Sequence, residues 1–524
     1  MDLIRLLSAI ISLFFIGYAP VYFLLLKNKS SALKFRSISG RVFVFFISFY
    51  IGMLVASIYL AILSMTGFKY SLANIGIFST VFFIVSIYLF IRKELLISKS
   101  KLGKGYDTKE PGFLIDSGKK WKLGKKADRT IFYIFFFLIF INFLVVLFFA
   151  LLFPIRFWDA IACWSLKGRA FFIDASIIPF FKSHDYQFAH LSYPLYLPLM
   201  QTWIYTWMGK INENLIKVIF PLFYLSGLFI FYYLFRQKYR RVIAIIYVFI
   251  FSALPVVMDH GYIEYTNLIF AIILMLAVYF FYLSVPPKGS VAAIDPETKS
   301  YLLLSTIFFG ILAQIRSEGL FFLGIFLIIN LVLNVAFIIK DKKAYKSFKT
   351  KTGKTTTSSV SKFKIDYYSR PILSIATPIL FSLLLMIVWV VLKYKLNIQF
   401  LSREWLPVLT GGQQNNIFGQ EIFSFSQALK ALFSELIFSA FDSTRAYLGS
   451  SYGVLWGVLF IFFVLNIKKL FKNFNWIFFV FIAAGFMVLF FSLGAIVDFI
   501  WSTDRYVLHL LPLTYFWILY NLPA

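Results

Sequence analysis

A succession of long apolar stretches is the feature that most limits how this chain can fold. Many of these stretches approach or exceed the roughly 20 residues that an α-helix needs to cross the hydrocarbon of a bilayer. Of the 524 residues, 60% are hydrophobic and 14% are charged, whereas soluble domains are about half apolar and about a quarter charged. The sequence therefore predicts an all-α integral membrane protein.

We expect about 13 transmembrane helices. Their predicted ranges are 6–26, 41–65, 73–91, 130–153, 213–235, 242–258, 265–283, 301–315, 320–339, 371–392, 453–467, 475–497 and 507–522. The first range is interpreted as a span and not as a cleaved signal peptide, because its apolar run is long and no clear A-x-A site follows it.

The distribution of charge predicts the orientation. With the N-terminus outside, six connectors fall on the inner side: 27–41, 92–129, 236–241, 284–300, 340–370 and 468–472. They contain 36 of the 51 Lys and Arg residues and 9 of the 23 Asp and Glu residues. Basic residues are retained on the cytoplasmic side, so the net charge of +28 indicates topology and predicts no nucleic-acid partner. We expect a multi-pass protein of the cell (plasma or inner) membrane.

This orientation holds only if the segment 193–208, which is rich in Tyr and Trp, does not cross the membrane. Pro194 and Pro198 interrupt its start, and Trp and Tyr favour membrane interfaces. We therefore expect residues 154–212 to form a large extracytoplasmic loop of juxtamembrane helices, a lid lying on the outer surface.

The chain divides into two expected parts: an N-terminal extension of three spans and a basic cytoplasmic loop, 1–129, and a catalytic transmembrane domain, 130–524. The second part contains a second outer loop, 393–452, and a cytoplasmic linker, 340–370. The linker includes GKT but lacks the other Walker glycine, so we interpret it as a flexible basic linker and not as an ATP site. The single cysteine, Cys163, excludes an intrachain disulfide.

Polar residues gather at the predicted outer ends of the spans, where ionisable groups near hydrocarbon tend to be paired or functional. They come from the first loop (Asp159, Lys167, Asp174, His184, Asp185, His190), from the turns DHGYIEY and AQIRSEGL (Asp259, His260, Glu264, Arg316, Glu318), from the second loop (Arg403, Glu404, Glu421, Glu435, Asp442, Arg445) and from the last turn (Asp498, Asp504, Arg505). Arginine and lysine side chains can bind the phosphate of a lipid-anchored substrate. A carboxylate can accept a proton from an attacking hydroxyl.

Several motifs occur in a recognisable order: WDAIACWSLKGRAFF after a long span, then HLSYPLYLPL, GYIEY, IRSEGL and DRYVLHLLP. In order and sidedness the chain resembles the GT-C superfamily of membrane glycosyltransferases, similar to protein O-mannosyltransferases and lipid A aminoarabinose transferases, over roughly 130–520. The resemblance implies an inverting transfer of a sugar from a polyprenyl-phosphate donor to a lipid-linked glycan, polysaccharide or protein acceptor at the outer membrane face.

The resemblance also implies roles for individual residues. Asp159 matches the acidic residue that acts as catalytic base. Family members often have two acids there, and Glu264 is our candidate for the second, with Asp174 behind it. The candidate contacts to the donor phosphate are Lys167, Arg316 and Arg505, and the candidate substrate-binding residues are His190, Tyr193, Asp174 and Glu318.

Each assignment has a simpler alternative. Asp159 could cap a helix or pair with Arg156, and Arg316 could form an ion pair with Glu318 across a tight turn. The histidines lack metal-ligand spacing, so we expect no required metal or cofactor. A divalent cation between Asp159 and the donor phosphate stays open as an alternative.

Two other functions compete with glycosyl transfer. A transporter or flippase of a lipid-linked sugar would show internal repeats and ionisable groups deep within its spans, whereas this sequence shows no internal repeat and has most of its charge at span ends. An O-antigen-type polymerase would use paired arginines in a late outer loop, and Arg403 and Arg445 keep that alternative open.

Overall fold

The computed structural model describes residues 1–27, 35, 37–98, 125–285, 296–352, 357–398, 452, 454–472, 474–493 and 505–523, and every regular element in these ranges is helical. The longer helices are α1 (Asp2–Val21), α3 (Ile38–Met65), α4 (Leu72–Ser98), α5 (Lys125–Leu152), α8 (Tyr196–Met208), α10 (Ile219–Arg236), α11 (Arg241–Ser252), α13 (Asn267–Ser284), α14 (Pro296–Ile315), α15 (Glu318–Thr352), α16 (Thr357–Lys395), α19 (Leu455–Leu470), α20 (Trp476–Leu493) and α22 (Leu511–Asn521). The shorter ones are η1 (Tyr22–Leu26), η3 (Asp159–Ser165), α6 (Leu166–Ile173), α7 (Ile178–Lys182), η4 (His184–Tyr186), α9 (Glu213–Ile216) and α12 (Pro255–Asp259).

Within these ranges, nine helical segments are long and apolar enough to cross a membrane. They are α1 with η1, α3, α4, α5, α9 with α10, α13, α14, α15 and α16. The prediction of an all-α, multi-pass membrane protein is confirmed. The other four expected spans coincide with the shorter described helices α11, α19, α20 and α22, and their length does not by itself establish a crossing.

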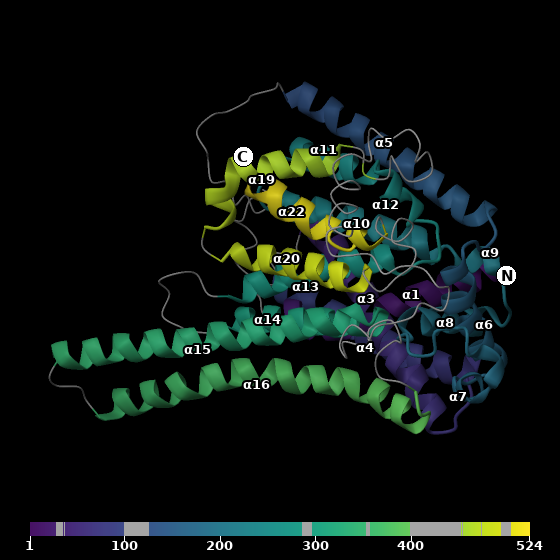
Figure 1. Ribbon diagram of the computed structural model, residues 1–524, viewed down its shortest axis with the longest axis horizontal. Coiled ribbons are helices and arrows are strands. Elements are labelled where there is room, and N and C mark those ends of the chain that lie inside the picture. The colour runs from purple at the N-terminus through teal and green to yellow at the C-terminus, as the bar shows by residue number, and fades with distance from the viewer. Residues whose placement is uncertain are drawn as a thin grey trace.

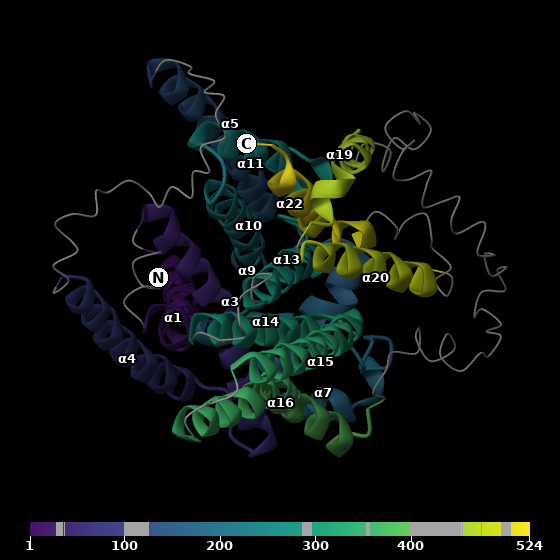
Figure 2. The ribbon, with the colours of Figure 1, turned by 90° about the vertical axis from the view of Figure 1, so that its left-hand side faces the viewer.

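Helix α13 lies at the centre of the bundle (Figures 1 and 2), packed against α10, α14, α20 and α22. Its sequence, NLIFAIILMLAVYFFYLS, is apolar on every face, which is the pattern of a helix surrounded by protein. The first residue of α13 is Asn267, and its polar side chain is buried in the protein interior.

Two glycines allow α1 and α3 to cross with their backbones in contact. A Cβ added to Gly17 would lie 1.7 Å from the carbonyl oxygen of Ser48, and one added to Gly52 would lie 1.8 Å from that of Leu13. Small residues permit such close approach of helices in membranes. The pair α1 and α3 also packs against α8, and α3 packs against α10, so the N-terminal helices are built into the bundle.

The segment 340–370 differs from the flexible linker that its composition predicts. Helix α15 continues to Thr352 and α16 begins at Thr357, so the described parts of this segment are helical. The two helices have 35 and 39 residues. Extending a helix that is already formed is easier than starting a new one, so each span continues into the polar segment. They measure about 52 and 58 Å at 1.5 Å per residue, against about 30 Å of hydrocarbon. Their ends project from the bundle at the left of Figure 1.

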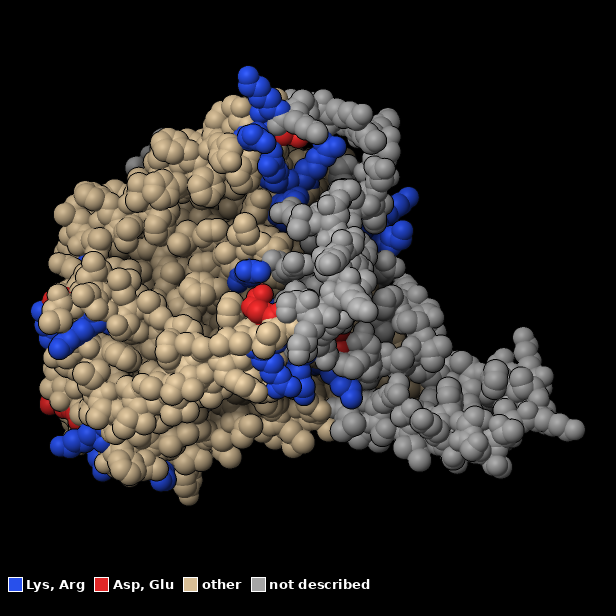
Figure 3. All heavy atoms as spheres, turned by 180° about the vertical axis from the view of Figure 1, so that it is seen from behind, with Lys and Arg blue, Asp and Glu red and all other residues tan. Residues whose placement is uncertain are grey.

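The charged side chains occupy the two ends of the molecule. On the face shown in Figure 3, mixed acidic and basic residues lie at one end, mainly basic residues lie near the other, and a broad uncharged surface separates them. The end with mixed charge collects the last residues of α3, α5, α14 and α16 and the first of α1, α13 and α15. Contacts across this end join Tyr70 to Ala175, Lys393 to Ser192 and Asp2 to Lys210.

The loop between α5 and α10 folds over this end as a series of short helices, and the longest of them, α8, is not a surface lid. All of α8 except Trp207 is buried, between α1, α3, α4, α6 and α14. The prediction that 193–208 lies on the surface is therefore wrong. The aromatic residues that indicated an interface instead fill the protein interior, where Trp203, Tyr196 and Tyr205 are fully buried.

Candidate functional site

Asp159 begins the helical turn η3, in the sharp bend that follows α5. Two residues earlier, Phe157 has φ +71°, a conformation that bulky residues rarely adopt and that concentrates at functional sites. This bend places Asp159 in the first turn of η3, where a carboxylate is favoured by the helix dipole. The carboxylate points toward the last segment of the chain.

The partner of Asp159 is Arg505, which lies 346 residues further along the chain. The distance from Arg505 Nη1 to Asp159 Oδ2 is 2.8 Å, and the two side chains are 24% and 38% exposed. The guanidinium also lies over the Tyr265 ring, 5.2 Å from its centroid. Burial works against the charged form of Arg505, but the neighbouring Asp159 carboxylate outweighs it, and the pKa of Arg505 is raised.

Neither simpler alternative for Asp159 is observed. The residue that caps η3 is Trp158, and it makes no side-chain cap hydrogen bond. Arg156 instead lies over the ring of Phe153, 3.8 Å from its centroid. The charge of Asp159 is thus directed to Arg505.

Arg316 distributes its hydrogen bonds among four neighbouring side chains. Its Nε and Nη2 donate to the carboxylate of Glu318, with Nη2–Oε1 at 2.9 Å, and Nη1 donates to Asn267 Oδ1 at 3.1 Å and to Thr266 Oγ1 at 3.4 Å. Nη2 also reaches the Tyr506 hydroxyl at 3.3 Å. The simpler alternative for Arg316, an ion pair with Glu318 across the turn between α14 and α15, is thus observed, and the pair is largely buried.

Asn267 joins Arg316 to two buried histidines. His260 Nδ1 lies 2.9 Å from the Val256 carbonyl, to which it must donate, so its Nε2 accepts from Asn267 Nδ2 at 3.3 Å. Asn267 Oδ1 accepts from Arg316 and from His509 Nε2, the latter at 3.4 Å. Burial lowers the pKa of His260 to about 4, which agrees with a neutral ring that accepts a hydrogen bond.

Lys167, in α6, is fully buried. Its Nζ donates to the backbone carbonyl of His190 at 2.9 Å, and burial lowers its pKa to about 7. His190 has φ +46°, and its ring stacks on Tyr193 with centroids 4.9 Å apart. Tyr193 in turn stacks on Trp164 and is close enough to Arg316 to favour the charged guanidinium.

The structure thus gathers most of the expected site residues into one connected cluster. The members of this cluster are Asp159, Arg505, Arg316, Glu318, Lys167, His190 and Tyr193.

Glu264 and Asp174 do not join the cluster. Glu264 is 2% exposed, burial raises its pKa to about 7, and its charged neighbours are Lys217, Glu213 and Arg156. Its Oε1 has no hydrogen-bond partner among the described residues. Asp174 is exposed at the end of α6.

Sequence reasoning missed Tyr265, Tyr506 and Asn267, which hold the cluster together. Tyr265 directly follows Glu264 in GYIEY, Asn267 lies two residues beyond the end of that motif, and Tyr506 follows Arg505 in DRYVLHLLP. A polar or aromatic residue beside each charged residue was thus visible in the quoted motifs, but residue type alone does not reveal which side chain faces the site. The candidates Arg403, Arg445, Asp498 and Asp504 lie outside the described residues.

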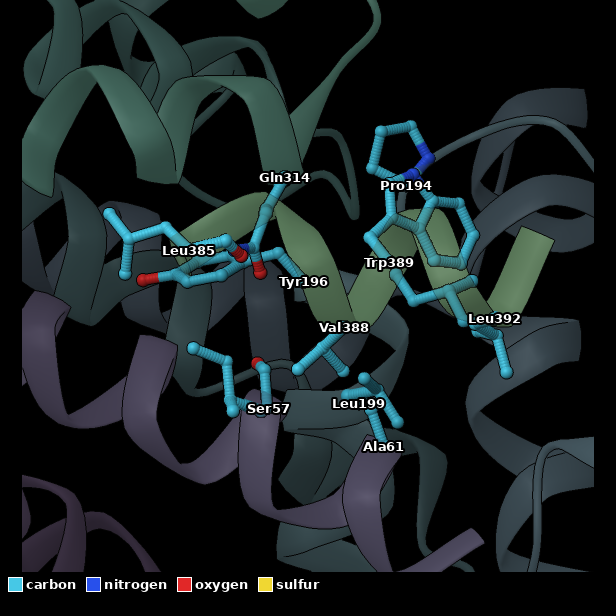
Figure 4. Close-up of a pocket in the computed structure, with 12 residues that line it drawn as sticks. Ser57, Ala61, Pro194, Tyr196, Leu199, Gln314, Leu385, Val388, Trp389 and Leu392 are labelled. Carbon is cyan, nitrogen blue, oxygen red and sulfur yellow. The ribbon is translucent and has the colours of Figure 1, made fainter. Parts of the chain in front are cut away.

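A small cavity lies beside the cluster, between α3, α8, α14 and α16 (Figure 4). Its volume is about 20 Å³, enough for about one water molecule. Gln314 and Tyr196 face it, but Gln314 donates to the Leu385 carbonyl and Tyr196 to the Tyr50 carbonyl. The Asp159–Arg505 pair, by contrast, is partly exposed.

Metal ligands do not gather anywhere in the described part of the chain, where no three His, Cys, Asp or Glu side chains are placed to hold an ion. No protein-family model, curated protein or solved structure matches this sequence.

Proposed function

We propose that this protein is an inverting glycosyltransferase that moves a sugar from a polyprenyl-phosphate donor to a lipid-linked glycan, polysaccharide or protein acceptor. The observation that carries the proposal is the partly exposed Asp159–Arg505 pair, 2.8 Å apart, at the end of the bundle where several helix termini meet. A carboxylate and an arginine at the edge of an apolar bundle provide a proton acceptor and a phosphate-binding cation for a lipid-anchored substrate.

In the proposed reaction, the Asp159 carboxylate accepts the proton of an acceptor hydroxyl. The hydroxyl oxygen forms a bond to the anomeric carbon of the donor sugar as the bond from that carbon to the phosphate oxygen breaks. The electron pair of the broken bond stays with the leaving polyprenyl phosphate, whose added charge Arg505 stabilises. A single displacement of this kind inverts the anomeric configuration.

Arg505 has a double role in this proposal. Without donor, it neutralises Asp159. A donor phosphate that takes over the guanidinium frees the Asp159 carboxylate to accept a hydrogen bond from the acceptor hydroxyl. Donor binding and activation of the acceptor are then coupled through one arginine.

Arg316 and Lys167 act as positioning residues in this scheme and not as direct phosphate contacts. Arg316 donates hydrogen bonds to four protein side chains. One of them is Tyr506, the residue that follows Arg505, so Arg316 helps to fix the position of Arg505. Lys167 is fully buried and holds the backbone of His190. His190 and Tyr193 form the aromatic side of the site, where a sugar or acceptor would bind.

Two further features of the chain support the proposal. The ordered motifs resemble those of GT-C glycosyltransferases, and the mixed charges at the site end contrast with the basic opposite end (Figure 3), as an extracytoplasmic site would require. We place the site on the outer face of the plasma or inner membrane, with no required cofactor and with membrane lipids as the surrounding solvent.

The test is a transfer assay with the purified full chain in liposomes. Synthetic polyprenyl-phosphate sugars serve as donors, and an extract of the cells that make the protein supplies acceptors. The proposal expects a covalent sugar product with inverted configuration and release of polyprenyl phosphate. Counterflow of the labelled lipid-linked sugar between leaflets without a covalent product would instead favour a flippase.

A further inference from the structure

A second cavity lies between α1, α3 and α4. Its volume is about 400 Å³, in the range of small-molecule sites. Helix α4 lies along the edge of the molecule and runs obliquely to α15, since it appears long in Figure 2 and foreshortened in Figure 1. It packs mainly on α1 and α8.

The walls of the cavity are apolar along most of their length. Phe14, Phe15, Phe45 and Ile87 are among the side chains that line it. The two serines in the wall, Ser48 and Ser86, donate to the carbonyls of Val44 and Phe15, so they offer little to a polar ligand. This part of the cavity suits a hydrocarbon chain.

Polar groups are concentrated at one end of the cavity. Arg41 is in the first turn of α3 and Lys93 is near the end of α4, and both line the cavity together with Tyr18. The Lys93 side chain is buried, yet its ammonium lies within the electrostatic reach of Arg41. Two cations brought together at the edge of an apolar cavity favour an anionic group between them.

The Tyr18 hydroxyl supplies a second and independent indication of a ligand. It is buried and has no hydrogen-bond partner in the described part of the chain, although buried hydroxyls are normally satisfied. One negative charge faces the same end, because Glu94 Oε1 lies 3.4 Å from Lys93 Nζ. An ammonium has three donors, so Glu94 leaves Lys93 able to bind a further acceptor, and the three charges sum to one positive charge.

We propose that this cavity binds one anionic membrane phospholipid, with an acyl chain between α1, α3 and α4 and its phosphate on Arg41, Lys93 and Tyr18. Basic pockets between transmembrane helices recognise phospholipid headgroups in this way. The phosphate site lies at the start of α3, whereas the end of α3 contacts the Asp159 loop near Ile177, about 40 Å away along a helix of 28 residues. The phospholipid is therefore a structural or regulatory ligand, separate from the donor of the proposed reaction and independent of that proposal.

The experiment measures lipid binding by the delipidated full chain, using native mass spectrometry in detergent. Phosphatidylglycerol and phosphatidylcholine with identical acyl chains are titrated in parallel. We expect one phosphatidylglycerol to bind more tightly than phosphatidylcholine. We expect Lys93→Gln to weaken phosphatidylglycerol binding about fivefold, the effect of one basic group near a lipid surface.

Arg92→Gln is the matched control, since Arg92 is exposed and does not line the cavity; it should change the affinity less than about twofold, well below the effect of one basic contact. Tyr18→Phe removes one oxygen and tests the site if Lys93→Gln folds poorly. Three results would each overturn the proposal: equal affinity for the two phospholipids, equal losses in Lys93→Gln and Arg92→Gln, or displacement of phosphatidylglycerol by an equal concentration of polyprenyl phosphate.

Discussion

Replacing Lys167 with methionine should make the stability of the protein less dependent on pH above neutrality. Methionine keeps the length and apolar contacts of the side chain and removes its charge. Lys167 is fully buried in α6, and its amine donates to the His190 carbonyl. The substitution therefore changes one titrating group in α6, the helix that directly follows the turn η3 of Asp159.

The expected size follows from the shift in the pKa of Lys167 from 10.5 to about 7. The unfolded chain keeps the proton up to about pH 10.5, whereas the folded protein releases it near pH 7. Because the unfolded state binds more protons in this interval, stability rises with pH. Between about pH 6.5 and 9.5 the titration of Lys167 adds about 3 kcal/mol to the unfolding free energy of the wild-type protein. The Lys167→Met protein has no such gain.

The assay compares the thermal unfolding of the wild-type protein and Lys167→Met in the same detergent across this pH range. With an unfolding entropy of about 2.1 cal/mol/K per residue, the difference in Tm should change by about 3 °C in favour of the wild type as pH rises. Lys182→Met is the matched control, since Lys182 is exposed in the same loop. A difference in Tm that stays constant with pH, or that changes equally in the control, would refute the assignment of a depressed pKa to Lys167.

Three further changes test other parts of the structure. Asn267→Leu should lower stability by about 2–4 kcal/mol in denaturant unfolding, because two imidazoles and one guanidinium N–H lose a buried partner; a neutral effect would contradict the hydrogen-bond network. Gly52→Ala should lower Tm and expression, because its Cβ would meet the Leu13 carbonyl at 1.8 Å, whereas Gly76→Ala, which meets nothing within 4 Å, should not. Glu264→Gln should remove about 3 kcal/mol of pH dependence between about pH 4.5 and 7, because the raised pKa makes the folded wild type lose stability as pH rises through that interval; unchanged pH dependence in unfolding would count against that pKa.

The helices were largely predictable because their signal is local. An apolar run of about 20 residues indicates a span whatever it packs against, and nine such helices are present in the described ranges. Segment 193–208 shows where the local signal ends. Tyr and Trp are as suitable for a protein interior as for a membrane interface, so only the tertiary contacts of α8 show that its rings are buried.

The site was predictable in part for a similar reason. Charged residues at span ends are visible in the sequence, and the structure joins Asp159 to Arg505 as neighbours. Whether a side chain at a turn points inward or sideways depends on one or two backbone angles. Glu264 and Tyr265 are adjacent in the chain, yet Tyr265 contacts Arg505 and Glu264 faces Lys217.

If Asp159 is the base of the proposed sugar transfer, Asp159→Asn should slow the chemical step, measured as the single-turnover rate with saturating polyprenyl-phosphate sugar. We expect a loss of about 10²–10⁴-fold, the usual contribution of a general base. Donor affinity should be equal or tighter, since Arg505 loses its competing carboxylate. Asp185→Asn, which alters an exposed acid of the same loop, should transfer at the wild-type rate. A folded Asp159→Asn protein that transfers sugar as fast as the wild type would show that Asp159 is not the base.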